Sequence, residues 1–343
     1  MPDHGSREEW DAAMCSRLER LDCHARTREQ FLEWQQEFRG ALRQVLGLPD
    51  MDRMPRVAQP RCVEDVPCDG YRRQKWSIAT EPDLHVPFYL LLPEGPAKPR
   101  PVVLALHGHG PGKVTPVGLQ PATAEPGDGE RDYAVQAVRQ GYIALAPDLR
   151  GMGELRRPED IEAGARSSCR TLQMHALFSG SCLIGQRVFD ISRLIDWLLT
   201  RDDVDPARIV ATGNSGGGTA TLFAAACDTR IAAAVPSCYF CTFADSILAM
   251  WHCECNYIPG MLTLGEMWNV AGLIAPRPLL ILAGAQDPIF PVAGVEHAYQ
   301  RLEEIYRVAG ASANLQKFVG PGGHRYYAEP VWPFFSRVFQ PKK

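Results

Sequence analysis

Short apolar runs alternate with helix-like segments through most of this chain, and the alternation restricts the folds that the chain can adopt. The runs with strand character cover residues 71–92, with the densest apolar part at 85–92, and residues 102–106, 142–146, 208–212, 231–235, 279–282 and 315–319. The segments with helical character cover residues 133–139, 184–199, 217–226, 295–308 and 333–339. Continuous short apolar runs are typical of strands that are buried on both faces of a parallel sheet. The pattern therefore predicts an α/β fold, a mostly parallel sheet with helices on both faces.

The two ends of this pattern suggest how the chain is divided. We expect residues 1–70 to form an N-terminal helical extension and residues 71–343 to form the main α/β domain. Apolar side chains recur at the helical spacing of three and four in the extension, at Phe31, Trp34, Phe38, Leu42 and Val45. Docking of this helix on the chain's own core is favoured over binding to a partner. Two long connections, 149–183 and 237–268, are expected to be loop or cap insertions beside a functional site.

The composition excludes several classes of function. The chain has 343 residues, of which 45% are hydrophobic and 22% are charged, as in ordinary globular proteins. Its formal net charge is −4 and no block of lysine and arginine stands out, so we expect no nucleic-acid partner. No apolar stretch is long enough to cross a bilayer, so we expect no membrane partner either. The oligomeric state stays open.

The N-terminal residues and the cysteines bear on location. Residues 1–21 are polar and lack the apolar segment of a secretory signal peptide, so we expect a cytoplasmic protein. Its eleven cysteines are then expected to be mostly reduced. No glycine-rich nucleotide motif follows a strand, so we expect no cofactor.

A glycine-rich turn carries the first candidate catalytic residue. The sequence Gly213-Asn214-Ser215-Gly216-Gly217 has the pattern G-x-S-x-G, with an apolar run before it and an alanine-rich helical segment after it. In this context the glycines allow a cramped strand-to-helix turn that lifts the serine hydroxyl above the sheet. We therefore expect Ser215 to be a nucleophile.

A serine nucleophile needs a base, and the base needs an acid that orients it. Asp287 follows the strand-like run at 279–282, and His324 lies in a glycine-rich loop after the last run. The order serine, aspartate, histidine is the one that this kind of α/β fold uses. We expect His324 to be the general base and Asp287 to orient it. Asp287 could instead be an ordinary turn aspartate, and His324 a surface loop histidine. These alternatives are weakened because Ser215, Asp287 and His324 occur in the expected order and each follows a strand-like run.

Donors for a developing oxyanion are expected near Ser215. The backbone N–H of Gly216 is one candidate, because it follows the nucleophile at a helix N-terminus. The other is the N–H of His109 in the turn His107-Gly108-His109-Gly110 after an apolar run. His107 is expected to shape this loop. A metal site of His107 and His109 is disfavoured, because the sequence supplies no third ligand beside them.

Four cysteines in the second long connection need a separate interpretation. Cys238, Cys241, Cys253 and Cys255 lie around His252, and the first two have a spacing that suits zinc. The second two are closer together than is usual in structural zinc sites, and aromatic residues surround all four. Free cysteine packs as a small apolar residue. Thiols in the wall of a pocket are therefore favoured and no metal is expected, while a structural metal stays an open alternative.

Taken together, the chain resembles the α/β-hydrolase superfamily over roughly residues 75–340. It looks most like the dienelactone-hydrolase-like and acetyl xylan esterase, or cephalosporin C deacetylase, branch. The resemblance rests on 106–109, 146–153, 213–217, 275–280 and Asp287-Pro288. In the second of these segments Asp148 and Arg150 are expected to form an ion pair that braces the loop.

The resemblance implies a serine carboxylic-ester hydrolase that acts through an acyl-enzyme. Short-chain or acetyl esters are the expected small-molecule substrates, with esters of carbohydrates among them. Dienelactone hydrolases use a cysteine nucleophile where this chain has Ser215, so lactone specificity is not implied. Two alternatives remain, a peptidase of the same fold and a catalytically silent binding protein on this scaffold.

Overall fold

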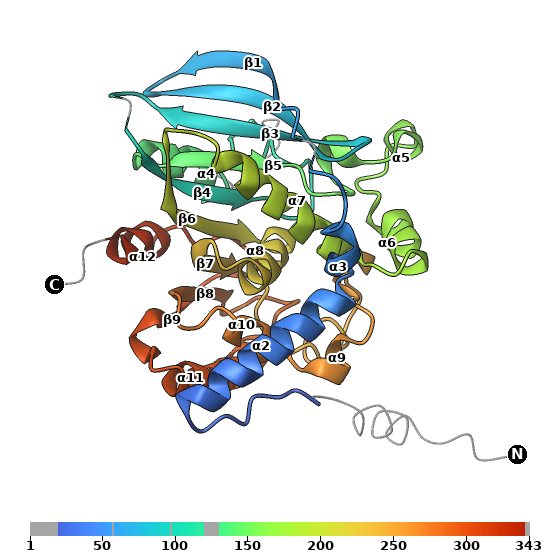
Figure 1. Cartoon of the computed structure of the whole chain (residues 1–343), viewed down its shortest axis with the longest axis vertical. Coiled ribbons are helices and arrows are strands. Elements are labelled where there is room, and N and C mark those ends of the chain that lie inside the picture. Colours follow the sequence, from blue (N-terminus) through green and yellow to red (C-terminus); the bar gives the residue numbers. More distant parts are fainter. Residues whose placement is uncertain (1–19, 57, 97, 120–129, 340–343) are drawn as a thin grey trace, which may run out of the picture.

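One mixed sheet crosses the molecule (Figure 1). The computed structural model describes residues 20–56, 58–96, 98–119 and 130–339. Within these residues the strand order is β1-β2-β3-β5-β4-β6-β7-β8-β9. The strands are β1 (Arg61–Cys68), β2 (Tyr71–Glu81), β3 (Leu84–Pro93), β4 (Arg100–Leu106), β5 (Ile143–Pro147), β6 (Val204–Asn214), β7 (Ile231–Ser237), β8 (Leu279–Gly284) and β9 (Leu315–Gly320).

The sheet is antiparallel at one end and parallel through the rest. Strands β1, β2 and β3 form an antiparallel meander, and β3 pairs antiparallel with β5. Every pair from β5 through β4 to β9 is parallel. The strand order changes direction at β4, whose neighbours are β5 on one side and β6 on the other. A crevice for ligands forms at such a point, outside the carboxyl ends of the strands.

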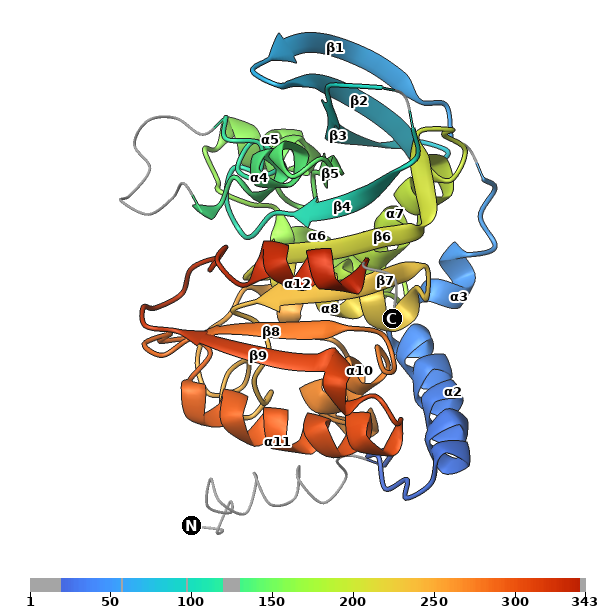
Figure 2. The ribbon, with the colours of Figure 1, turned by 90° about the vertical axis from the view of Figure 1, so that its left-hand side faces the viewer.

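Helices cover both faces of the sheet, as expected. They are α2 (Arg28–Val45), α3 (Leu48–Met51), α4 (Tyr133–Arg139), α5 (Pro158–Glu162), α6 (Cys169–Phe178), α7 (Leu183–Leu198), α8 (Gly216–Cys227), α9 (Met261–Leu264), α10 (Met267–Gly272), α11 (Val292–Val308) and α12 (Val331–Val338), with 3-10 turns η2 (Gly153–Leu155), η3 (Glu254–Asn256) and η4 (Ser312–Asn314). Figure 2 shows α12 in front of the sheet and α8 behind it. The predicted α/β fold is confirmed.

Two hydrophobic cores correspond to these two faces. Along β4, Leu104 and Leu106 enter the core shared with α7 and α8, while Val103 and Ala105 enter the core shared with α4 and α12. This alternation follows from the period of two along a strand. All four side chains are almost fully buried, so β4 shows the continuous apolar run that a central strand requires.

The N-terminal helix α2 packs on the body of the same chain. Its start carries a capping box, in which the Thr27 side chain accepts from the Gln30 N–H and the Gln30 side chain accepts from the Thr27 N–H. The buried face consists of Phe31, Trp34, Gln35, Phe38 and Leu42. Arg39 donates to the carbonyl oxygens of Ala226 and Leu273. The favoured interpretation, that this helix docks on the chain's own core, is therefore confirmed.

The expected helical extension over 1–70 contains a strand, because β1 begins at Arg61. The sequence of β1 gives no apolar signal, since most of its side chains are exposed on the edge of the sheet. Residues 1–19 lie outside the described part of the chain. The domain boundary at residue 70 stays a prediction.

None of the helices in the described ranges combines the length and apolar character needed to span a membrane. The cytoplasmic location expected from the sequence stays a prediction.

Asp22 fastens the segment before α2 to the body of the protein. Its carboxylate accepts hydrogen bonds from Trp268 Nε1 at 3.0 Å and Asn269 Nδ2 at 2.9 Å, and it pairs with Arg301 at 2.6 Å. Burial by itself would raise the pKa of Asp22, but the two hydrogen bonds and the Arg301 charge outweigh it and lower the pKa. The folded state therefore favours the ionised carboxylate.

We expect Asp22→Ala to lower the free energy of unfolding at pH 7 by about 2 kcal/mol, because hydrogen bonds to a charged group are lost. The pKa of Asp22 is lower in the folded state, so its contribution is complete above the unfolded value of about 4. It is lost as the pH falls through the folded value. Urea unfolding between pH 7 and pH 3 should show the difference from wild type shrinking in acid.

Asp50→Ala is the matched control, because the Asp50–Arg53 ion pair is exposed and should contribute little. A difference for Asp22→Ala that is absent at pH 7, or that grows as the pH falls, would contradict the expectation.

Candidate active site

Ser215 occupies a strained turn between β6 and α8. Its backbone has φ 56° and ψ −121°, a region that residues other than glycine rarely adopt. The Ser215 N–H donates to the Ser237 carbonyl at 2.9 Å, which ties the turn to the end of β7. The turn lifts the side chain out of the sheet at its carboxyl edge, as the G-x-S-x-G pattern predicted.

The glycines flanking Ser215 are required by close backbone contact. A Cβ on Gly217 would lie 1.9 Å from the Leu106 carbonyl oxygen, and a Cβ on Gly213 would lie 2.3 Å from the same atom. Any side chain at either position would push the turn away from β4. The turn can form only because both positions lack a side chain.

His324 and Asp287 form a hydrogen-bonded pair. The distance between His324 Nδ1 and Asp287 Oδ2 is 2.8 Å. The second oxygen, Oδ1, accepts the N–H groups of Ile289 at 3.0 Å and Phe290 at 3.1 Å. A carboxylate only accepts, so Nδ1 carries the proton and Nε2 is left as the acceptor. The ring of His324 also stacks on Phe290, with centroids 5.8 Å apart.

Asp287 is held in its ionised form. Burial by itself would raise its pKa, but the hydrogen bond and charge of His324 and the two backbone N–H groups lower the pKa below its usual value. Asp287 is buried, with a relative exposure of 6%. A buried anion beside an imidazole stabilises that ring when it takes up a proton.

A single cavity brings Ser215 and His324 together. Its lining consists of Gly108, His109, Pro111, Thr115, Arg131, Tyr133, Asn214, Ser215 and His324. The cavity lies at the carboxyl ends of β4 and β6, where the strand order changes direction. Asp287 stands behind His324, bonded to its other ring nitrogen. Folding therefore gathers all three predicted residues, which are far apart in sequence.

The two residues expected to supply oxyanion donors are in contact. Gly216 is the first residue of α8, where backbone N–H groups have no acceptor within the helix. The ring of His109 packs on Gly216, since a Cβ there would lie 2.7 Å from His109 Nδ1. Gly108 also lies against the turn, since its Cβ would lie 3.4 Å from that of Ser215. The donor role of both N–H groups stays a prediction.

His107 shapes the loop after β4, in agreement with the sequence. It is fully buried, Nδ1 donates to the Gly108 carbonyl at 2.8 Å, and Nε2 accepts the Leu149 N–H at 3.0 Å. Burial lowers the pKa of His107 to about 4, so the ring is neutral. His107 therefore connects the loop after β4 to the start of the 149–183 connection.

The prediction of an ion pair between Asp148 and Arg150 is wrong. Asp148 accepts from Lys113 Nζ at 2.7 Å, and Arg150 donates to both oxygens of Asp190, each at 2.7 Å. Arg150 also pairs with Glu81. The true partners are far away in sequence, so nothing local in the motif could reveal them.

The four cysteines of the 237–268 connection do not form one group. Cys238 Sγ donates to the Arg325 carbonyl at 3.1 Å, and Cys241 Sγ lies 3.7 Å from the Pro291 carbonyl. The other two lie together, with 3.4 Å between the sulfur atoms of Cys253 and Cys255. The sequence spacing of Cys238 and Cys241 suits a metal site, but the structure separates these two cysteines from Cys253 and Cys255.

The model of the Abhydrolase family matches residues 18–321, and the chain belongs to this family. The inferred hydrolase YtaP of Bacillus subtilis (strain 168) is 27% identical over 69% of this chain and 77% of its own length. Carbohydrate esterase MZ0003, from an unknown prokaryotic organism, is 27% identical over 36% of this chain. The matched region spans about a third of that esterase, 32%.

The fold is also that of a solved structure, described as an inferred acetyl xylan esterase from Bacteroides fragilis NCTC 9343. The TM-score is 0.82, the identity is 20%, and the match covers 99% of this chain and 97% of the other. The family and fold expected from the sequence are confirmed.

We expect Gly217→Ala to lower the free energy of unfolding by about 1–3 kcal/mol, because the new methyl group overlaps the Leu106 carbonyl. Urea unfolding measures this change. Gly40→Ala is the control, because a Cβ there meets nothing within 4 Å in helix α2. That variant should gain about 0.5–1 kcal/mol from helix propensity. Equal effects of the two substitutions would contradict the close contact at Gly217.

Proposed function

We propose that this member of the Abhydrolase family is a serine esterase that hydrolyses short-chain or acetyl esters of carbohydrates through an acyl-enzyme. The observation that carries the proposal is the His324–Asp287 hydrogen bond, at the edge of the cavity that Ser215 also lines. Nucleophile, base and orienting acid are the parts that acyl transfer requires.

In the proposed reaction Ser215 Oγ attacks the carbonyl carbon of the ester. His324 Nε2 accepts the hydroxyl proton as the bond forms, and the carbonyl oxygen becomes an oxyanion. The backbone N–H groups of Gly216 and His109 stabilise that oxygen. His324 then donates the proton to the leaving alcohol, and the acyl group stays on Ser215. Water, deprotonated by His324, hydrolyses the acyl-enzyme and restores the serine.

Asp287 has two roles in this scheme. It fixes the tautomer of His324 with Nε2 free to accept a proton, and its charge stabilises the imidazolium that forms. Its lowered pKa supports both roles, because the carboxylate stays ionised at neutral pH. The hydrogen bonds from Ile289 and Phe290 hold the carboxylate in place.

Two observations support a carbohydrate as the alcohol part of the substrate. Residues with polar side chains, among them Thr115, Arg131 and Asn214, line the cavity next to Ser215. Such a lining suits an alcohol with several hydroxyl groups better than an alkyl chain. The name of the relative MZ0003 and the description of the Bacteroides fragilis structure both refer to esterases that act on carbohydrates.

We expect Ser215→Ala to abolish esterase activity and labelling by a fluorophosphonate probe, because the nucleophile is lost. Asp287→Asn should keep the fold and lower kcat by about 10³–10⁴-fold, because it disturbs the tautomer of His324. Ser179→Ala, which alters a serine at the end of α6, is the control and should label fully. Initial rates on p-nitrophenyl acetate and gel fluorescence measure the two effects.

Folded wild-type protein that takes up no probe would favour a silent binding protein over an enzyme. Cleavage of peptide substrates in preference to esters would favour the peptidase alternative.

We expect acetylated sugars to be hydrolysed with a higher kcat/KM than p-nitrophenyl esters of long acyl chains. The physical reason is the polar lining beside Ser215. Acetate release from acetylated xylose, followed by a coupled assay, measures this preference. Hydrolysis of alkyl esters alone would contradict the carbohydrate assignment and leave the esterase assignment in place.

A further inference from the structure

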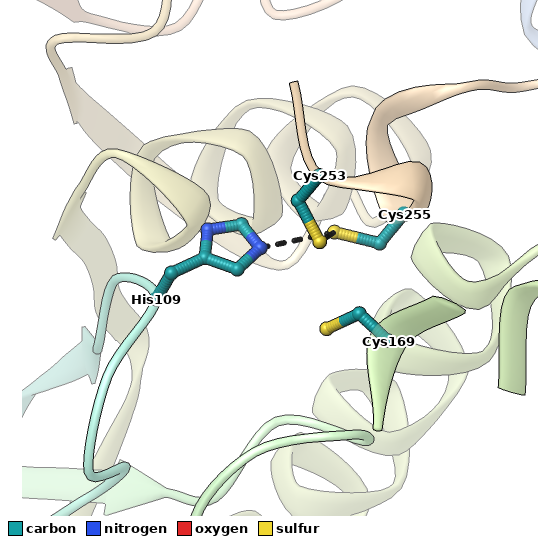
Figure 3. Close-up of side chains that lie close together, drawn as sticks. All are labelled: His109, Cys169, Cys253 and Cys255. Atoms are coloured by element: carbon teal, nitrogen blue, oxygen red, sulfur yellow. Dashed lines mark hydrogen bonds between the residues drawn. The ribbon is translucent and has the colours of Figure 1, made fainter. Parts of the chain in front are cut away.

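Four potential metal ligands from three separate segments meet beside the active-site cavity (Figure 3). They are His109 after β4, Cys169 at the start of α6, and Cys253 and Cys255 at η3. The side chains point toward one another, and their donor atoms all lie within 4.8 Å of each other. His109 Nε2 is 3.2 Å from Cys255 Sγ, which is 3.4 Å from Cys253 Sγ.

These separations suit tetrahedral coordination. Zinc binds thiolate sulfur at about 2.3 Å and imidazole nitrogen at about 2.0 Å, which places tetrahedral donors about 3.5–3.8 Å apart. Three thiolates with one imidazole are a common ligand set of structural zinc sites. Soft sulfur donors in a tetrahedral arrangement also select zinc over magnesium, calcium or manganese. We propose that His109, Cys169, Cys253 and Cys255 bind one Zn²⁺ ion.

A buried arginine provides independent support. Arg187, on α7, is fully buried. Nε and Nη2 donate to the Arg150 carbonyl at 3.0 and 2.7 Å, and Nη2 also donates to Cys169 Sγ at 3.2 Å. Nη1 has no hydrogen-bond partner in the part of the chain that the structure describes. Across the same residues, no carboxylate pairs with Arg187 at ion-pair distance.

A buried cation needs an anion nearby, and the zinc site supplies one. Three thiols lose their protons to solvent when the ion binds, so Zn²⁺ with three thiolates and a neutral imidazole carries one negative charge. The guanidinium beside Cys169 balances this charge. Three neutral thiols would leave Arg187 buried beside no anion, which is unfavourable.

The site also has a route for the ion to enter. Cys169 and Cys255 are buried and Cys253 is half-buried, whereas His109 is exposed. An ion can therefore approach the thiols from the exposed side of the cluster, at His109. The sequence spacing of Cys253 and Cys255 is unusual for zinc. The other two ligands, His109 and Cys169, come from distant segments, so spacing within one loop does not decide whether these residues bind zinc.

Four protein ligands complete the tetrahedron, so the ion has no open position for water or substrate. Its role is structural. It joins the loop after β4 to both long connections, 149–183 and 237–268. His109 is a positioning residue in this arrangement, because its ring is held by zinc while the residue also lines the cavity with Ser215. The proposal goes beyond the esterase function and does not depend on it.

The first test is the metal content of the full-length protein, purified without chelator and exchanged into metal-free buffer. Plasma mass spectrometry should find about one zinc per chain. Cobalt exchanged for zinc should give thiolate-to-cobalt charge transfer and the intense d–d bands of tetrahedral Co²⁺. Under native conditions a thiol reagent should modify three more cysteines after a strong chelator is added than before.

Variants assign the ligands. Cys255→Ala and Cys169→Ser should lose at least nine tenths of the bound zinc, and chelator should no longer lower their melting temperature. Cys241→Ser is the matched control, a buried thiol of the same 237–268 connection that lies outside the cluster, and should keep about one zinc per chain. The cobalt spectrum and thiol count of the wild type test the site even where a variant does not fold.

Three results would overturn the proposal. Wild-type protein incubated with zinc and then exchanged into metal-free buffer could retain less than a tenth of an ion per chain. Iron or copper could be the bound metal under the same conditions. Peptide mapping of the protein as purified, before any chelator is added, could find a disulfide between Cys253 and Cys255. Zinc binding by an inactive protein would leave this proposal intact and count only against the esterase function.

Discussion

The close contact between the end of β4 and the turn after β6 is the constraint on which the active site depends. At this contact the Leu106 carbonyl leaves no room for a side chain on Gly213 or Gly217. This close approach of the Leu106 carbonyl to the turn forces Ser215 into its strained backbone conformation and turns its side chain toward the cavity. It also brings Gly108 against the serine. Nucleophile and neighbouring backbone are thus placed by one packing requirement of the sheet.

Buried charges fix the loops around this contact. Lys113 pairs with Asp148, and Arg150 pairs with Asp190, so that the segments after β4 and β5 are attached to each other and to α7. Removing one partner of a buried pair is strongly destabilising, because the remaining charge has no counterion. The proposed zinc site extends the same principle to Arg187. Rigid loops are what preorganised donors at an oxyanion require.

Much of the fold and the candidate site could be predicted because the signals are local. The strand-like runs and helical segments correspond closely to the strands and helices, with α4 predicted to the residue. Ser215, Asp287 and His324 could be proposed because each follows a strand of a parallel sheet, and such strand ends meet at one edge. Strand β1 was missed because its exposed side chains carry no apolar pattern.

The sequence by itself determined the fold, the family and the order of the three candidate catalytic residues. Turns, hydrophobic periodicity and strand ends depend on residues that are close together in the sequence. Only the tertiary structure decided which distant side chains meet. It paired Arg150 with Asp190 instead of Asp148, and it separated Cys238 from the thiols that lie beside His109. Ion pairs and metal clusters depend on distances across the folded chain, and spacing along the sequence does not encode those distances.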